Sequence, residues 1–99
     1  MLQIRTTPVS NDVVLEFSGE FDTLGAEELA AVAAAQTAGA RLVIDLSRAR
    51  PIQDKALGRL VDALPQARKH TVRGAGPHHR RLLECLGAVV EEEELREKG

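Results

Sequence analysis

Few side chains in this 99-residue sequence have the type and spacing that covalent or metal chemistry requires. Cys85 is the only cysteine and lies in a leucine-rich helical pattern, which predicts a buried structural thiol rather than a nucleophile. His78 and His79 are adjacent, so on a helix their side chains should point apart and make a poor pair of metal ligands. The sequence suggests neither a Ser–His–Asp nor a Cys–His arrangement. We therefore expect no catalytic residue, no metal site and no cofactor.

Two further segments lack what a binding motif needs. The turn at Gly74-Ala75-Gly76 lacks the Lys-Ser/Thr pair or the third glycine of a phosphate-binding loop. The glutamates at 91–94 are most simply a solvated end of the chain, because nothing near them suggests folding around a cation. The sequence therefore does not predict an enzyme.

Four basic residues cluster in the sequence between one predicted strand and the next helix: Arg48, Arg50, Lys55 and Arg59. Lys55 and Arg59 are four residues apart, so a helix would place both on one face. They fit either an ordinary exposed face or a partner-binding surface. In open α/β sheets, sites gather in the loops after the carboxyl ends of the strands, and this loop is one of them.

Composition narrows the classes of partner. The chain has two Phe and neither Trp nor Tyr, so it lacks the aromatic platform on which bases stack. Its formal net charge of −2 gives no general attraction to nucleic acid or to anionic lipid. A single cysteine fits a reducing compartment, and no apolar run is long enough to span a bilayer. We expect a cytoplasmic protein without direct membrane insertion.

Hydrophobic periodicity and turn residues predict one α/β domain over residues 1–99, with a mixed sheet in the order β-β-α-β-α-β-α-β and helices packed on it. Asp22 or Thr23 should cap the first helix, with Glu27 and Glu28 in its first turn and Gly39 at its end. The predicted strands are 2–6, 13–19, 41–46, 70–73 and 89–90, and the predicted helices are 25–37, 55–64 and 77–86. A turn is expected at Pro8 to Asp12, Pro65 should bend or end the second helix, and residues 91–99 form a charged tail.

Three segments together resemble a STAS domain, the family of the bacterial anti-sigma factor antagonists. They are FSGEFDTLGAEEL (17–29), RLVIDLSRA (41–49) and PIQDKALGRLVDAL (51–64). The family pattern has Gly-x-Leu-Asp before its first helix, which here reads Gly19-Glu20-Phe21-Asp22. It then has a strand ending in Asp-Leu-Ser, here Asp45-Leu46-Ser47, and a loop of the Ile-Asp-Ser-Ser-Gly-Leu type before the next helix.

The resemblance implies a partner-switching function. In such antagonists a Ser or Thr in that loop is phosphorylated by the partner, an anti-sigma factor with kinase activity, and the added charge breaks the complex. This sequence departs from the pattern at that point. Gln53 aligns with the usual Asp, Asp54 with the phosphoacceptor, Lys55 with the next Ser and Ala56 with the Gly, so no hydroxyl remains in the loop.

Three roles for Asp54 remain open. It could act as a helix cap or first-turn acid, as a permanent and weaker mimic of the phosphate, or as an acceptor of an aspartyl-phosphate. The third role would need a Mg²⁺-binding cluster of acids, and none is evident in the sequence.

The leading hypothesis is a non-enzymatic domain for transcription regulation that binds an anti-sigma factor or kinase-like regulatory protein. The predicted contacts lie on two loops and the helix starts that follow them: Phe21, Asp22, Thr23, Leu24, Pro51, Ile52, Gln53, Asp54, Lys55, Ala56, Gly58 and Arg59. One alternative is an accessory subunit of a lipid-transporting ABC system that contacts its ATPase. A second is a small-ligand-binding STAS domain. The oligomeric state is left open.

Overall fold

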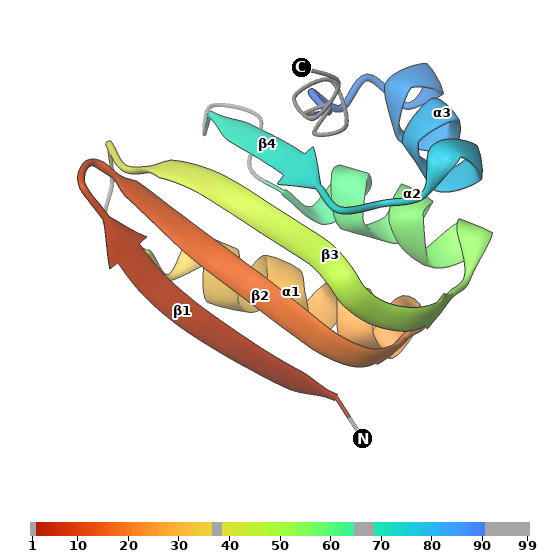
Figure 1. The fold of residues 1–99 in the computed structure, drawn as a ribbon, viewed down its shortest axis with the longest axis horizontal. Helices are drawn as coiled ribbons and strands as arrows, with labels where there is room; N and C mark the ends of the chain where they lie inside the picture. The colour runs from red at the N-terminus through yellow and green to blue at the C-terminus, as the bar shows by residue number, and fades with distance from the viewer. Residues whose placement is uncertain (1, 37–38, 65–68, 91–99) are drawn as a thin grey trace, which may run out of the picture.

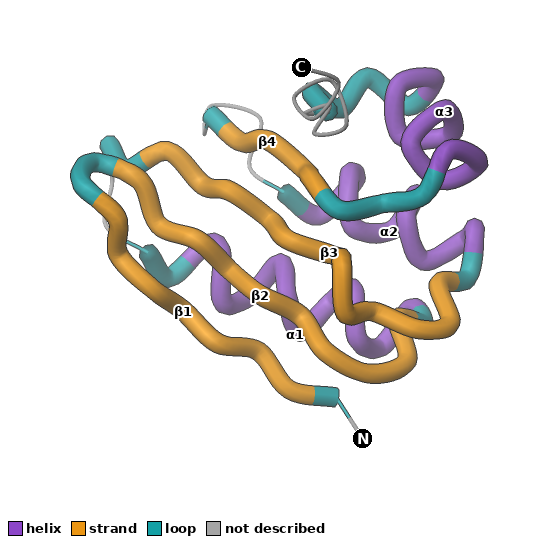
Figure 2. Tube along the Cα trace, in the orientation of Figure 1, coloured by secondary structure: helices purple, strands orange, loops and turns teal. Residues whose placement is uncertain are grey.

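The computed structural model describes residues 2–36, 39–64 and 69–90. Its elements are β1 (Gln3–Val9), β2 (Asp12–Phe21), α1 (Thr23–Ala34), β3 (Arg41–Ile52), α2 (Asp54–Ala63), β4 (His70–Arg73) and α3 (Pro77–Cys85), shown in Figures 1 and 2. The predicted α/β class with a mixed sheet is confirmed. The last predicted strand is reduced to one parallel bridge between Val72 and Val90.

The sheet has the order β1-β2-β3-β4. β1 and β2 form the predicted antiparallel hairpin, whereas β2–β3 and β3–β4 pair in parallel. The turn prediction at Pro8 was wrong, because Pro8 lies inside β1 opposite Val13. β1 is an edge strand, and an edge tolerates a residue that has no N–H to donate. The turn itself is at Ser10, which has a positive φ of 57°.

The two central strands run further than the hydrophobic pattern predicted. β2 continues to Phe21 and β3 to Ile52, and these two residues are neighbours in the register. The pairing shifts twice along the way, between Glu16 and Ser18 and again between Gly19 and Phe21. The hydrophobic pattern did not predict the continuation of β3, because polar side chains follow Leu46. The backbone pairing between β2 and β3 nevertheless continues there. Both strands therefore reach the same end of the sheet before their helices begin (Figure 1).

The core lies between the sheet and helices α1 and α2, which cover its rear face in Figure 1. The prediction that strand 41–46 is buried on both sides was half right. Leu42, Ile44 and Leu46 point into the core, and Val43 is also buried, but Asp45 on the other face is only partly covered. The fully buried large side chains are Leu15, Phe17, Phe21, Leu29, Leu42, Ile44, Leu46, Leu57, Leu60, Val72 and Leu83.

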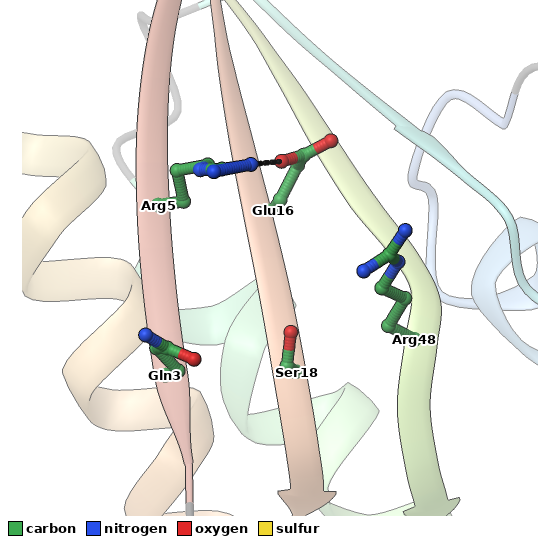
Figure 3. A pocket seen from close by; sticks show the side chains of 5 residues that line it. All are labelled: Gln3, Arg5, Glu16, Ser18 and Arg48. Carbon is green, nitrogen blue, oxygen red and sulfur yellow. Dashed lines mark ion pairs between the residues drawn. The ribbon is translucent and has the colours of Figure 1, made fainter.

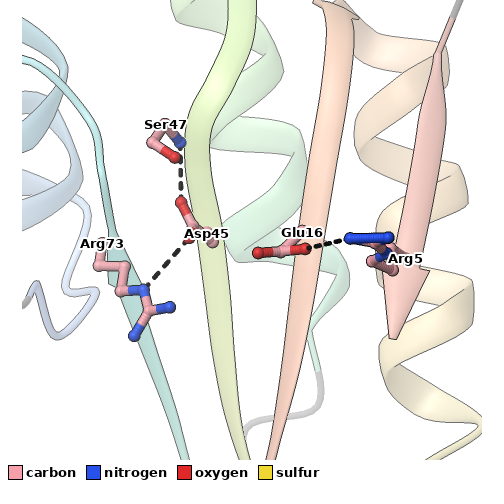
Figure 4. Close-up of polar contacts among 5 residues, drawn as sticks. All are labelled: Arg5, Glu16, Asp45, Ser47 and Arg73. Atoms are coloured by element: carbon pink, nitrogen blue, oxygen red, sulfur yellow. Dashed lines mark hydrogen bonds and ion pairs between the residues drawn. The ribbon is translucent and has the colours of Figure 1, made fainter. Parts of the chain in front are cut away.

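A row of charged residues crosses the open face of the sheet, with an arginine on each outer strand and a carboxylate on each of the two central strands (Figure 4). Arg5 is paired with Glu16, Glu16 with Asp45, and Asp45 with Arg73. Arg73 Nε lies 3.3 Å from Asp45 Oδ2, and the backbone N–H of Ser47 donates to Asp45 Oδ1 at 2.9 Å. Burial acts to raise the pKa of Asp45, but the hydrogen bonds from the N–H and the hydroxyl of Ser47 and the charge of Arg73 together lower it more, so the pKa of Asp45 lies below its usual value.

The helices differ from their predictions mainly at their ends. α1 begins at Thr23, with Asp22 as the predicted cap, but Glu27 and Glu28 lie beyond its first turn. The helix ends at Ala34, well before Gly39. The predicted end at residue 37, the predicted bend or end of the second helix at Pro65 and the charged tail 91–99 lie outside the described residues.

The prediction that Cys85 is a buried thiol was wrong, because it is exposed on α3. Of the four residues expected on its core side, only Leu83 is buried within this helix; Leu82 is half-buried, and Cys85 and Leu86 are exposed. The helix is nine residues long and lies beside the edge strand. It buries a narrower stripe of side chains than the spacing of its leucines suggested. Gly87, with a φ of 93°, follows the helix as predicted.

Within the described part of the chain, the helices are too short or too polar for any of them to cross a bilayer.

Candidate functional site

Two loops lie side by side where β2 and β3 end. The backbone N–H of Gln53 donates to the carbonyl of Phe21 at 3.0 Å, which extends the pairing of Phe21 with Ile52. α1 begins two residues after Phe21, and α2 begins two residues after Ile52. The starts of both helices therefore occur at the same end of the sheet, at the right in Figure 1.

The predicted contact residues fall into three groups by the exposure of their side chains. Phe21 and Ala56 are completely buried, so the prediction that they touch a partner was wrong. Their side chains belong to the hydrophobic core beneath the loops. We call the exposed group the loop face; it consists of Thr23, Leu24, Pro51, Gln53, Asp54, Lys55 and Arg59. Asp22, Ile52 and Gly58 are half-buried at its base.

The buried residues shape the first loop from below. Phe21 packs edge-on against Phe17, with ring centroids 4.9 Å apart. Asp22 Oδ1 accepts a hydrogen bond from the backbone N–H of Gly25 at 2.8 Å and so caps α1. A Cβ at Gly25 would lie 3.0 Å from the Phe17 ring, so this turn packs closely on the aromatic pair. Leu24, in contrast, is 62% exposed at the first turn of the helix.

The basic residues do not act as one patch. Arg59 Nη2 lies 2.8 Å from Glu27 Oε2, which joins α2 to α1. Arg48 lines a shallow pocket of about 180 Å³ on the sheet, together with residues of β1 and β2 (Figure 3). In the same pocket, Arg5 pairs with Glu16 at 3.8 Å. Lys55 and Arg59 are the basic residues that belong to the loop face.

Asp54 is the first residue of α2 and contacts two histidines. His78 Nε2 lies 3.1 Å from Asp54 Oδ2, and His79 Nε2 lies 3.3 Å from Oδ1. The hydrogen bond with His78 has the largest effect on the pKa of Asp54; together with the electrostatic interactions with both histidines it outweighs the opposing effect of desolvation, so this pKa is lowered from its usual value. The cap position belongs to Gln53, whose side chain makes no capping hydrogen bond in the described structure.

The prediction that His78 and His79 point apart was wrong. Both lie in the first turn of α3 and turn toward the start of α2, with ring centroids 4.9 Å apart and ring planes at 73°. Adjacent long side chains can converge on a third group that stands beside the helix end. The sequence offered one weak signal, because Pro77 is typical of a first helical position and so places both histidines at a helix start.

The arrangement allows an evaluation of the roles considered for Asp54. Asp54 lies in the first turn of α2, as the role of a first-turn acid requires. Among the described residues, the ligand group around Asp54 contains two imidazoles and no second carboxylate, so nothing supports an aspartyl-phosphate centre. The nearby Ser47 directs its N–H to Asp45 on the open face of the sheet rather than to the loop (Figure 4).

Comparisons with known proteins agree with this fold. A family model described as "Mlab, STAS domain" matches residues 4–90. An anti-sigma factor antagonist from Mycobacterium paratuberculosis has 20% identity and a TM-score of 0.64, with 94% of this chain and 87% of that chain covered.

The unphosphorylated anti-sigma factor antagonist SpoIIAA has 18% identity and a TM-score of 0.66, with 97% of this chain and 94% of that chain covered. Comparison with curated proteins gives no match. The family match extends over most of the chain, from β1 to the bridge at Val90, and therefore establishes that this chain belongs to the STAS domain family.

Proposed function

We propose that the chain is a non-enzymatic regulatory protein that binds an anti-sigma factor or a kinase-like regulatory protein through the loop face. One observation carries the proposal. The Gln53–Phe21 hydrogen bond joins the two segments that lead into α1 and α2, and both helix starts carry exposed side chains. Two structural neighbours are antagonists of anti-sigma factors, which is consistent with this function.

Asp54 has a specific role in this proposal. On the resemblance in the sequence, Asp54 aligns with the phosphoacceptor of the family. Its side chain is exposed at the start of α2. A carboxylate there carries a permanent negative charge, smaller and shorter than a phosphate. Binding would therefore be independent of Ser/Thr phosphorylation in this loop and would be set by the fixed charge.

The test begins with capture of the partner from the native organism by the tagged full-length chain. The affinity of the purified partner is then measured calorimetrically for the wild type, Asp54→Ser and the control Asp62→Ser, which changes an exposed acid of the same helix outside the loop face. We expect Asp54→Ser to change affinity more than it changes the free energy of unfolding. Equal binding by wild type and Asp54→Ser, with both folded, would refute the role of Asp54.

A phosphorylation assay sharpens the test. If the captured partner is a kinase, ATP should label Asp54→Ser, which restores the hydroxyl of the family, and should not label the wild type or Lys55→Ser at this loop. Mass spectrometry of the loop peptide locates the phosphate. Labelling of the wild-type loop peptide would contradict the proposal.

The second candidate is an accessory subunit that packs on the ATPase of a lipid-transporting ABC system. The observation that favours it is the loop itself, since residues 51–56 carry no hydroxyl and the ABC function does not require phosphorylation. Capture of an ABC ATPase with its permease, instead of an anti-sigma factor, would select this function. The small-ligand alternative has weaker support, because the pocket beside Arg48 is smaller than usual ligand sites.

A further inference from the structure

Three side chains from two helices converge at the edge of the loop face. Asp54 opens α2, and His78 and His79 lie in the first turn of α3. Their possible ligand atoms all lie within 4.8 Å of one another. We propose that these three residues form a site for a divalent transition-metal cation, with Zn²⁺ as the best fit.

The distances suit a tetrahedral ion. Ligands about 2.0–2.1 Å from a tetrahedral Zn²⁺ lie about 3.3–3.4 Å from each other. The two nitrogen–oxygen separations at Asp54, 3.1 Å and 3.3 Å, are close to that value. In the present arrangement these pairs are hydrogen bonds, so a metal would replace the Nε2 protons and each ring would keep its proton on Nδ1.

The donor set favours a particular class of metal. Two imidazoles and one carboxylate suit Zn²⁺ and its neighbours in the first transition row, whereas Mg²⁺ and Ca²⁺ prefer oxygen ligands alone. Three protein ligands leave a fourth position for water or for a side chain from another protein. The site is accessible, because the side chains of His78 and Asp54 are 69% and 58% exposed, while His79 at 23% is the more fixed member.

Local electrostatics partly oppose a cation. The positive ends of the α2 and α3 dipoles face the site, and Lys55 follows Asp54 in the chain. The carboxylate of Asp54 offsets this effect, and neutral imidazoles bind metal without adding charge. Coordination from two helices would also fix the start of α3 against α2, a pair of elements that already pack together.

The consequence for regulation rests on the proposed function, although the metal site itself does not. A Zn²⁺ bound at Asp54 would replace the fixed negative charge of the loop face with a positive one. Asp54 belongs to the loop face, so a cation bound there would lie at the edge of the surface where a partner would dock. The cation would therefore serve as the input at a position where other members of the family use phosphate.

The experiment titrates ZnCl₂ into the full-length metal-free protein by calorimetry and follows CoCl₂ by its visible d–d bands. All proteins carry Cys85→Ser, because Cys85 is an exposed thiol that could bind metal itself. The test variants are Asp54→Asn, His78→Gln and His79→Gln. The matched controls are Asp62→Asn in α2 and Glu84→Gln in α3, both exposed and outside the cluster.

We expect one Zn²⁺ per chain, a tetrahedral Co²⁺ spectrum, and an affinity lowered about tenfold or more by each test variant but unchanged by the controls. Far-UV circular dichroism confirms that each variant is folded. Absence of saturable binding, or equal binding by the triple test variant, would overturn the site. Octahedral Co²⁺ bands with unchanged affinity in all variants would place the metal elsewhere and overturn it as well.

A second arm measures partner affinity with and without Zn²⁺. We expect a change for the wild type and none for His79→Gln. An unchanged affinity in the presence of a saturated metal site would overturn the regulatory consequence alone. Failure of the wild type to bind the partner through the loop face both with and without Zn²⁺ would instead count against the proposed function, so the two failures are distinguishable.

Discussion

Two leucines of α1 provide a matched test of which side of the helix start is available to a partner. Leu24 is 62% exposed, whereas Leu29 is completely buried in the core. Replacing each with Ala in the same helix makes the same change in helix propensity and in the unfolded chain. Leu29→Ala should lower the free energy of unfolding by about 2–5 kcal/mol, because it removes buried methyl groups and leaves a cavity. Leu24→Ala should change it by less than about 0.5 kcal/mol.

These differences are large against the total stability of a domain of this size, which is about 5–15 kcal/mol. The assay is urea unfolding followed by far-UV circular dichroism, because the chain has no Trp or Tyr for intrinsic fluorescence. In thermal unfolding, Leu29→Ala should lower the Tm by about 10 °C or more, and Leu24→Ala by less than about 4 °C. In partner binding, only Leu24→Ala should reduce affinity at a temperature where both variants are folded. Equal destabilisation by both changes would refute the orientation of α1 described above.

Three further outcomes follow from the contacts described. Asp22→Ala should lower the free energy of unfolding by about 1 kcal/mol through loss of the α1 cap, and Asp22→Asn should restore most of it in the same urea assay. The pKa of Asp45 is lowered in the folded state, so its contribution to stability is present above the unfolded pKa and is lost as the pH falls through the folded value, below 3.8. Asp45→Asn, which removes the charge facing Arg73, should therefore flatten the stability–pH curve below about pH 4; an unchanged curve would contradict the assigned shift. Gly74→Ala should destabilise the fold, because Gly74 has a φ of 85° and a Cβ there would lie 2.6 Å from the backbone N of Ser47; a Tm equal to the wild type would show that the close approach is absent.

The fold class could be predicted because its signals are local. The apolar run 41–46 reads as a central strand, and the helices show their periodicity and one of their caps within a single segment. The junction between this strand and the next helix could be located for the same reason, although the predicted loop is reduced to Gln53 between β3 and α2. The ends of the strands were less predictable. β3 continues to Ile52 through polar residues, because its backbone remains paired with the neighbouring strand β2. That support comes from a segment far away in the sequence.

The sequence predicted which segments form the candidate site, but it did not predict which side chains contact one another there. Phe21 is adjacent to exposed residues in the sequence, yet its side chain points into the core against Phe17. His78 is separated by 24 residues from Asp54, and no spacing rule relates a residue in one helix to a residue in another. The exposure of Cys85 likewise depends on where α3 lies beside the sheet, which periodicity alone does not determine.

The most direct test of the central claim places a photo-crosslinking amino acid at Gln53 on the loop face, or at Thr7 on the exposed edge strand β1 as a control. Both proteins are irradiated in cells of the native organism, and the adducts are identified by mass spectrometry. The proposed function predicts that the Gln53 position captures an anti-sigma factor or kinase-like regulatory protein and that the Thr7 position does not. Capture of that protein from Thr7 alone would contradict the assignment of the loop face as the docking surface.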